Sequence, residues 1–131
     1  PFLVSSTVEG VMAQRLVRIL CASCRRARRA TAEESALLGA DAGDPPVVYD
    51  AAGCADCGHS GHHGRTAIVE ILPINDELDE LIATGATRAA MLGAARELGF
   101  RSLAEDGVDK VLDGVISLAE LMRAVHLKGR A

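Results

Sequence analysis

Four cysteines are the residues of this sequence with the most defined chemistry. They form two C-x2-C pairs, Cys21-Ala-Ser-Cys24 and Cys54-Ala-Asp-Cys57, which use every cysteine in the chain. Two residues between ligands allow a tight turn to direct both sulfur atoms at one ion, and four thiolates complete a tetrahedral zinc site. Because such a site has no open position for water or a substrate, the pattern predicts a structural zinc ion and not a catalytic one.

The same four thiols have other interpretations. They could form two disulfides, be four unrelated buried thiols, or act as a dithiol redox centre, for which C-x-x-C is a known motif. Residues 25–53 separate the pairs, which exceeds the commonest zinc-ribbon spacing, so this segment is expected to carry structure of its own. Two pairs at this separation fit a metal better than a redox centre. Thiols kept free for a metal indicate a reducing compartment, hence the cytoplasm.

The composition narrows the classes of fold and partner. The chain has 131 residues, 49% of them apolar, and its only aromatic residues are Phe2, Tyr49 and Phe100. A core of aliphatic side chains favours close-packed helices. The net charge of −4 and the scarcity of aromatic side chains make the chain a poor general nucleic-acid binder. No apolar run reaches the ~20 residues that span a bilayer, so no direct membrane insertion is predicted.

Residues 1–20 are expected to form a helix after a short extended lead. Their apolar residues recur at helical spacing, for example at Val8, Met12, Leu16 and Ile19. A lone helix cannot bury such a stripe, so a partner upstream is expected, and the chain is interpreted as a fragment of a longer protein.

Residues 21–72 are predicted to form a small zinc-bound subdomain that contains β-structure. Thr31 and Glu34 have the spacing of a capping box, which predicts a short helix after Thr31. Residues 47–49 and 66–72 are rich in β-branched side chains and predict strands. The glycine-dense segment that follows the second cysteine pair is expected to turn. The histidines in it are interpreted as turn residues and not as ligands: His59, His62 and His63.

Residues 73–131 are predicted to form a helical subdomain. Capping residues at Asn75, Thr87, Ser102 and Ser117 indicate four short helices with short connections. Such helices imply a small bundle, and residues 127–131 are expected to be frayed. The predicted fold class is therefore α+β and mainly helical, with a small zinc-bound β-containing subdomain and a C-terminal helical bundle.

The densest charge run is Arg25-Arg-Ala-Arg-Arg29. One interpretation is a patch that binds nucleic acid. The favoured interpretation is that Arg25 and Arg26 offset the negative charge of the thiolates while the other arginines are solvated.

Motifs for an independent active site are absent. The sequence contains no G-x-x-x-x-G-K-[ST] loop for phosphate, no G-x-S-x-G and no H-E-x-x-H. We therefore predict that this chain alone is not an enzyme and hydrolyses no ATP.

The order of the motifs resembles the C-terminal part of the type II secretion and type IV pilus assembly ATPases, the GspE/PilB family of hexameric motors. The matching segments are residues 10–18, the two C-x-x-C pairs, residues 57–61 and 64–70, Ser102-Leu-Ala-Glu-Asp-Gly107 and Gly114-Val-Ile-Ser-Leu-Ala-Glu120. The combination is specific, although no single segment is. The four-cysteine motif places the resemblance in the assembly and secretion branch, because retraction-type pilus ATPases lack it.

This resemblance implies a RecA-like ATPase core whose last helix corresponds to residues 1–20, then a zinc-binding insertion and a helical C-terminal region. ATP and Mg²⁺ would be cofactors of the full-length protein only. Arg65 matches the Gly-Arg motif of the family, and its planar guanidinium is suited to contact nucleotide phosphates in the assembled ring. An alternative role for Arg65 is to hold the cysteine region to the helices. His62 stands where the family usually has an aromatic residue.

The resemblance also implies partners and a location. The partners are other subunits of a homohexameric ring and inner-membrane platform proteins, with no nucleic acid. The location is the cytoplasm, peripheral to the inner membrane through these partners. Two functions compete with a coupling region of a secretion motor: a free-standing zinc-ribbon module that binds nucleic acid or protein, and a dithiol redox protein.

Overall fold

The computed structural model describes residues 2–127, and its fold is α+β. This part of the chain contains six α-helices, four strands and one short 3-10 turn. In sequence order the elements are α1 (Phe2–Thr7), β1 (Gly10–Leu20), β2 (Arg26–Arg29), α2 (Ala32–Leu37), β3 (Val47–Asp50), η1 (Ala55–Cys57), β4 (His62–Pro73), α3 (Asp76–Ala83), α4 (Arg88–Glu97), α5 (Leu103–Leu112) and α6 (Leu118–Ala124). The predicted α+β class is confirmed. The frayed end predicted for residues 127–131 lies outside the described residues except at Leu127.

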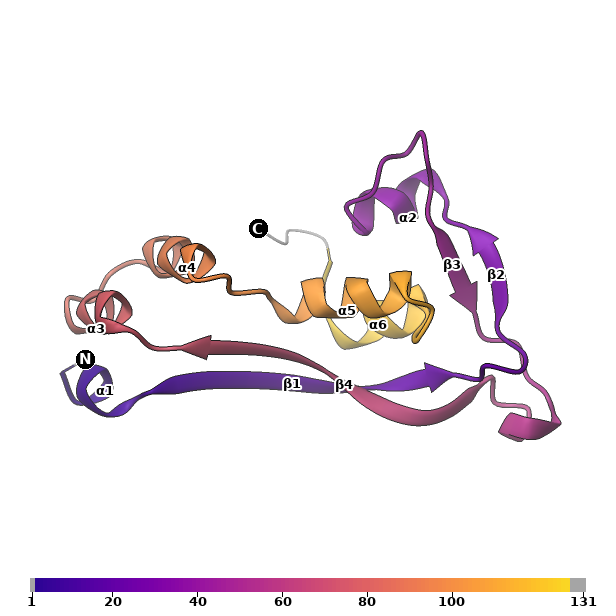
Figure 1. The fold of residues 1–131 in the computed structure, drawn as a ribbon, viewed down its shortest axis with the longest axis horizontal. Coiled ribbons are helices and arrows are strands. Elements are labelled where there is room, and N and C mark those ends of the chain that lie inside the picture. Colours follow the sequence, from indigo (N-terminus) through magenta and orange to yellow (C-terminus); the bar gives the residue numbers. More distant parts are fainter. Residues whose placement is uncertain (1, 128–131) are drawn as a thin grey trace. The chain divides into compact units, whose positions relative to one another are not determined.

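The strands form two small sheets of two strands each. β1 pairs with β4, and the arrows of these two strands point in opposite directions in Figure 1. β2 pairs with β3 in an antiparallel register that places Arg26 opposite Asp50 and Arg29 opposite Val47. The strands predicted for residues 47–49 and 66–72 are therefore confirmed, whereas β2 lies in the arginine run, for which no strand was expected.

The prediction of a helix over residues 1–20 is wrong for residues 10–20, which form strand β1. Helical spacing of apolar residues is a weak signal in a segment that also holds β-branched residues, and pairing with another strand overrides it. Within β1, the side chains of Val17 and Leu20 are buried at 1% and 3% exposure. Only α1, at Phe2–Thr7, is helical in this segment.

The chain divides into two compact units, each of which is built from two stretches of sequence. The first unit comprises residues up to 14 and residues 69–102, and the second comprises residues 15–68 and the chain from 103 onward. In the first unit, α3 packs against α1 and α4. Its helices begin as predicted: the Asn75 side chain accepts the N–H of Leu78, and the Thr87 hydroxyl accepts the N–H of Ala90.

The second unit holds the larger hydrophobic core. α5 packs against α6, as both ribbon views show, and each of these helices contacts β3. The most deeply buried apolar side chains of this core are Val17, Val48, Ile68, Val111, Ile116 and Leu121. They come from β1, β3, β4, α5, α6 and the α5–α6 turn, so residues from both stretches of the unit fix its structure.

Candidate metal centre

Two tight turns present the cysteine pairs. Cys21 follows the end of β1, and the N–H of Arg25 donates to the carbonyl of Cys21 at 3.0 Å. The second turn is η1, in which the N–H of Cys57 donates to the carbonyl of Cys54 at 3.3 Å. Because each turn reverses the chain within four residues, both sulfur atoms of a pair point to the same side.

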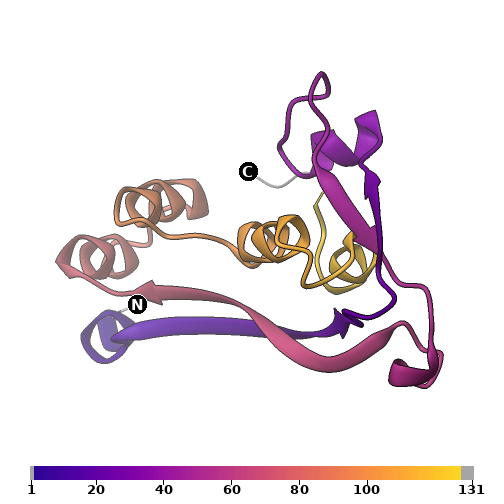
Figure 2. The same ribbon diagram turned by 45° about the vertical axis from the view of Figure 1, so that its right-hand side comes forward.

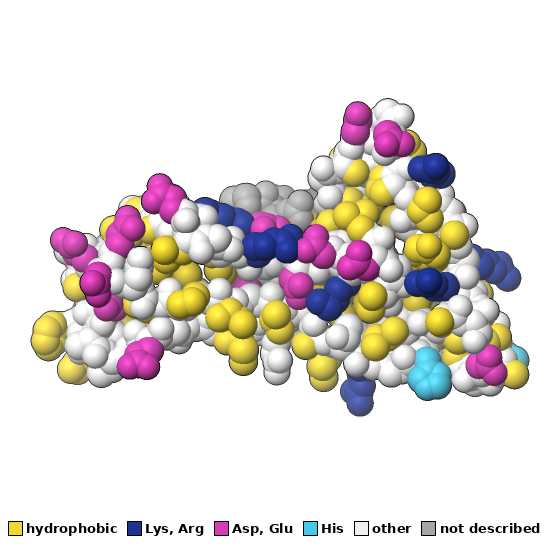
Figure 3. Space-filling view, in the orientation of Figure 1, with side chains coloured by type: hydrophobic (Ala, Val, Ile, Leu, Met, Phe, Trp, Pro, Cys, Tyr) yellow, Lys and Arg dark blue, Asp and Glu magenta, His cyan; other side chains and the backbone are white. Residues whose placement is uncertain are grey.

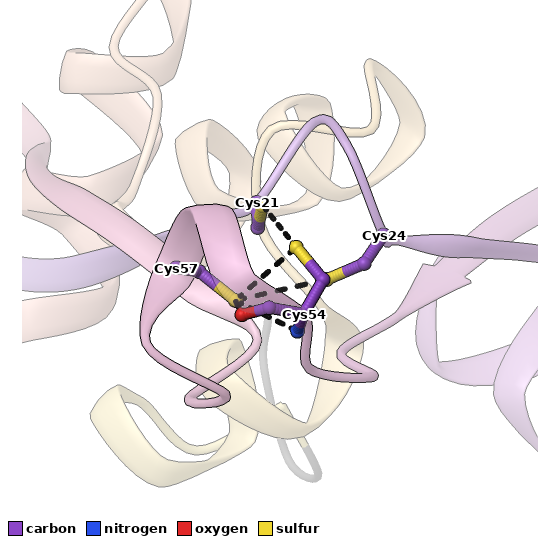
Figure 4. Close-up of side chains that lie close together, drawn as sticks. All are labelled: Cys21, Cys24, Cys54 and Cys57. Atoms are coloured by element: carbon purple, nitrogen blue, oxygen red, sulfur yellow. Dashed lines mark hydrogen bonds between the residues drawn. The ribbon is translucent and has the colours of Figure 1, made fainter.

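The two turns bring the four sulfur atoms together, as Figure 4 shows. All four Sγ atoms lie within 4.8 Å of one another. Three Sγ–Sγ distances are 3.8 Å: Cys21 to Cys54, Cys24 to Cys57, and Cys54 to Cys57. A tetrahedron with metal–sulfur bonds of about 2.3 Å has edges of about 3.8 Å. The donor set therefore fits one tetrahedral metal ion.

The geometry separates this arrangement from the alternative of two disulfides. The four cysteines are free in the structure. Each of the three 3.8 Å separations is far longer than the bond of about 2.05 Å that joins two sulfur atoms in a disulfide. The convergence of all four thiols on one point also argues against the alternative of four unrelated buried thiols.

Backbone N–H groups surround the sulfur atoms. Gly53 donates to Cys24 Sγ at 3.3 Å, while Cys54 and Gly61 donate to Cys57 Sγ at 3.3 and 3.2 Å. Burial raises the pKa of Cys57, but hydrogen bonds from Cys54 and Gly61 outweigh burial and lower this pKa to about 6. Burial raises the pKa of Cys54 to about 11. Cys57 is therefore the thiol of the second pair that ionises first.

The segment that carries the first cysteine pair is tied to the α5–α6 turn. The N–H of Leu20 donates to the carbonyl of Val115 at 2.9 Å. The Arg25 guanidinium donates to the carbonyl of Gly114 and lies over the ring of Tyr49, 4.3 Å from its centroid. The contacts that the structure shows for Arg25 therefore place it as a link to this turn.

Glu120 makes a further link that the sequence did not reveal. Its carboxylate accepts the backbone N–H and the guanidinium of Arg18 at 2.8 and 3.0 Å, and the guanidinium of Arg123 at 2.7 Å. The Glu120 side chain is only 1% exposed. Hydrogen bonds from Arg123 and then Arg18 hold the pKa of this carboxyl well below its usual range, against the effect of burial. The three-residue spacing of Glu120 and Arg123 on a helix was the available signal.

Two helices of this unit begin at the capping residues that were predicted for them. The capping box of Thr31 and Glu34 is confirmed, with both of its hydrogen bonds present. At α6 the Ser117 hydroxyl accepts the N–H of Glu120, as expected for a cap. The Glu120 side chain, however, binds arginines rather than the start of its own helix.

The arginine run makes contacts within the protein. Arg28 donates to both carboxylate oxygens of Glu34 at 2.7 and 2.8 Å and to Asp50 at 2.6 Å. Arg29 donates to the carbonyl of Pro45. Figure 3 shows Lys and Arg side chains scattered among acidic and apolar ones on the face that it draws. These contacts weigh against the run as a nucleic-acid patch, because three of its guanidinium groups, those of Arg25, Arg28 and Arg29, already bind carboxylates or carbonyls.

The remaining candidate residues lie on the turn after the second pair and on β4. His59 is the one residue other than glycine with positive φ among those described, at 64°, which agrees with its interpretation as a turn residue. His62 contacts Ser60 through its ring. Arg65 is exposed on β4, and the structure brings it into neither the cysteine cluster nor the Glu120 links.

Comparison with known proteins places the chain in a family. The sequence pattern of the family described as "Type II/IV secretion system protein" matches residues 1–123. The chain belongs to this family. The general resemblance drawn from the motif order is therefore confirmed.

Several related proteins match almost the whole chain. The chain is 43% identical over 126 residues to the type II secretion system protein E of Pseudomonas aeruginosa, covering 96% of the chain and 25% of that relative. It is 44% identical over 123 residues to the type II secretion system ATPase E of Vibrio cholerae, covering 94% and 24%. It is 39% identical over 128 residues to the type IV pilus assembly ATPase PilB of Myxococcus xanthus, covering 93% and 22%.

The chain thus spans about a quarter of the length of these relatives. Among the residues that the structure describes, no helix has the length and apolar character that crossing a bilayer requires.

Proposed function

We propose that this chain is the C-terminal, zinc-binding coupling region of a hexameric ATPase that powers protein secretion or pilus assembly. Residues 21–72 would be the zinc-binding segment and residues 73–131 the helical segment, of which α5 and α6 belong to the same compact unit as the cysteines. Two of the related proteins that match almost the whole chain are named as ATPases of type II secretion and of type IV pilus assembly. The activity of the full-length protein, with ATP and Mg²⁺ as its cofactors, is part of this proposal.

The observation that best supports zinc is the spacing of the four sulfur atoms. Thiolates are soft ligands that favour zinc, and a tetrahedral four-sulfur site is typical of zinc or iron–sulfur centres. Cys21, Cys24, Cys54 and Cys57 would all bind the ion, which leaves it no open position. The ion would then stabilise the fold and take no part in a reaction.

The contacts between the cysteine segment and helices α5 and α6 support the proposed coupling role. Hydrogen bonds of Leu20 and Arg25 join the end of β1 and the first cysteine pair to the α5–α6 turn, and those of Arg18 join β1 to α6. A change in the position of the helices would therefore move the metal-bound turns as well. We propose that this connection passes motion between neighbouring ring subunits, and from the ring to platform proteins at the inner membrane. Arg65, exposed on β4, is proposed to reach nucleotide phosphates in the assembled ring.

Metal content and metal-dependent folding test the zinc proposal. We expect one zinc ion per purified chain, and we expect a chelator or Cys54→Ser to unfold the second unit, because structural zinc supplies about 10–16 kcal/mol of apparent binding free energy. Hydrogen exchange would then rise in β2, β3, α5 and α6, while α3 and α4 stay protected. Ala55→Ser is the matched control, since it adds the same hydroxyl at an exposed position between the two ligands. A wild-type chain that binds no zinc, or whose unfolding is unaffected by chelator, would contradict the proposal.

A further inference from the structure

Gly61 touches both cysteine pairs through its backbone. Its N–H donates to Cys57 Sγ at 3.2 Å. Its carbonyl accepts the N–H of Cys21 at 3.0 Å. The backbone of Gly61 therefore connects a sulfur atom of the second pair to the backbone of the first pair.

Gly53 makes a second connection to the first pair. It directly precedes Cys54 in the sequence, and its N–H donates to Cys24 Sγ at 3.3 Å. The segment that carries the second pair thus supports a sulfur atom of the first pair. Gly61 and Gly53, which both lie in the segment of the second pair, therefore each bond to a cysteine of the first pair, Cys21 and Cys24.

Neither position has room for a side chain. A Cβ atom on Gly61 would lie 2.8 Å from the Cβ of Ala51 and 3.1 Å from the backbone nitrogen of Ala52. A Cβ atom on Gly53 would lie 2.9 Å from the carbonyl oxygen of His59. These neighbours are backbone atoms or a short side chain, so they can move away only if the turn itself moves. Both glycines also have positive φ, 79° at Gly61 and 136° at Gly53.

We propose that Gly53 and Gly61 are positioning residues of the metal site, which hold the two cysteine pairs in the tetrahedral arrangement before the ion binds. This inference rests on the proposed zinc function. A thiolate that accepts an N–H hydrogen bond carries less excess charge, and its direction is fixed before the metal arrives. Partners that orient ligands in this way typically change metal affinity by about 10–100-fold when they are altered.

Two other glycines of the same segment provide matched controls. Gly64 has the same φ as Gly61, 79°, but a Cβ atom there would meet only the end of the Ile19 side chain at 3.9 Å. Gly58 has φ of 62° and no atom within 4 Å of a Cβ. Alanine at these positions brings the same kind of left-handed backbone strain as at Gly61, without a collision and without displacing an N–H from sulfur.

The experiment measures metal affinity in the 131-residue chain and in its Gly61→Ala, Gly53→Ala, Gly64→Ala and Gly58→Ala variants. Zinc affinity is measured by competition with a chromophoric chelator. Co²⁺ is used as a second probe, because its absorption reports the geometry of the sulfur ligands. We expect Gly61→Ala and Gly53→Ala to weaken zinc binding about 10–100-fold relative to the two controls, and to change the Co²⁺ spectrum.

A second measurement separates positioning from general destabilisation. The rise in melting temperature that saturating zinc produces is compared between variants. A residue with a merely structural role would lower the melting temperature equally with and without zinc, whereas a positioning residue reduces the rise itself. A variant too unstable to melt cooperatively without metal is judged by its Co²⁺ spectrum at saturation, which an altered ligand geometry changes.

The possible outcomes separate a failure of this inference from a failure of the proposed zinc binding. If the wild-type chain takes up no zinc, the proposed function fails and the inference fails with it. If the wild type binds zinc and Gly61→Ala binds as tightly as Gly64→Ala, with the same Co²⁺ spectrum, the inference alone is overturned. A selective loss at Gly61 and Gly53 supports both.

Discussion

Glu120 joins chain segments that lie 102 residues apart in the sequence. Its buried carboxylate accepts hydrogen bonds from two guanidinium groups that are themselves half-exposed, Arg18 and Arg123. A buried carboxylate with charged hydrogen-bond donors is stable only while it is ionised. The link between β1 and α6 is therefore sensitive to acid.

We predict that Glu120→Gln removes a pH-dependent part of the stability. The folded pKa of Glu120 is lowered, so its stabilisation is complete above the unfolded pKa of about 4.3 and is lost as the pH falls through the folded pKa. The variant should have an unfolding free energy about 1–3 kcal/mol lower than the wild type at pH 7. This difference should narrow as the pH is lowered from 5 toward 3.

Denaturant unfolding at a series of pH values measures this difference. Asp113→Asn is the control, because it makes the same kind of acid-to-amide change at an exposed position. A difference between wild type and Glu120→Gln that stays constant across the pH range would contradict the prediction. Shared effects of acid on the cysteines cancel, since both proteins carry the same four thiols.

Residue identity and spacing were enough to predict that the four thiols cluster, because each C-x2-C pair forms a local turn. They were not enough to predict the Glu120 links. Arg18 lies in a segment that was predicted to be a helix, and Ser117 was predicted only to cap the helix that carries Glu120. The contact between Arg18 and Glu120 depends on a strand and on a tertiary arrangement, which local patterns do not encode.

Among the elements, helix starts were predicted well. Thr31, Asn75, Thr87 and Ser117 all cap helices in the structure. A cap is a contact within four residues, so the sequence contains all of it. β1 and β2 were missed because a strand needs a partner from elsewhere in the chain. Their own residues, including three arginines among the four residues of β2, gave no alternating apolar pattern.

Replacing glycine by alanine is expected to have opposite effects on stability in two helices of equal length, α5 and α4. Gly107 of α5 is buried, and a Cβ there would collide with the buried side chain of Leu121 in α6. We expect Gly107→Ala to lower the unfolding free energy by about 1–3 kcal/mol through overpacking. Gly93 of α4 is exposed with open space around it, so Gly93→Ala should stabilise by about 0.5–1 kcal/mol through helix propensity.

Chemical denaturation of both variants measures these free energies. Hydrogen exchange should assign the change to α5 and α6 for Gly107→Ala and to α4 for Gly93→Ala. Equal effects of the two substitutions would show that the α5–α6 contact is looser than the structure indicates.

For the molecule as a whole, the prediction concerns Arg65 in the full-length protein. If Arg65 contacts nucleotide phosphates, Arg65→Ala should lower the rate of ATP hydrolysis by roughly tenfold or more, as loss of a transition-state arginine does. Arg26→Ala is the matched control, because Arg26 is also exposed on a strand. Steady-state phosphate release measures both, and zinc content confirms that the metal site is intact.

Equal rates for the Arg65 and Arg26 variants would favour the alternative role of Arg65 as a structural residue.

Motif order was sufficient to predict the family of the whole chain. The division into two units was not predicted, because each unit combines stretches that are distant in the sequence.

The second unit is built from two separate stretches of sequence, so the ribosome completes one stretch before it begins the other. All four thiols have been translated once residue 57 is made, but the stretch that supplies Gly114, Val115 and Glu120 begins only at residue 103. At about 5–20 residues per second, a ribosome needs roughly 2–10 s to bridge this interval. A nascent chain therefore presents its complete set of sulfur ligands before their supporting helices exist. Early capture of a metal ion would protect these thiols until α5 and α6 emerge.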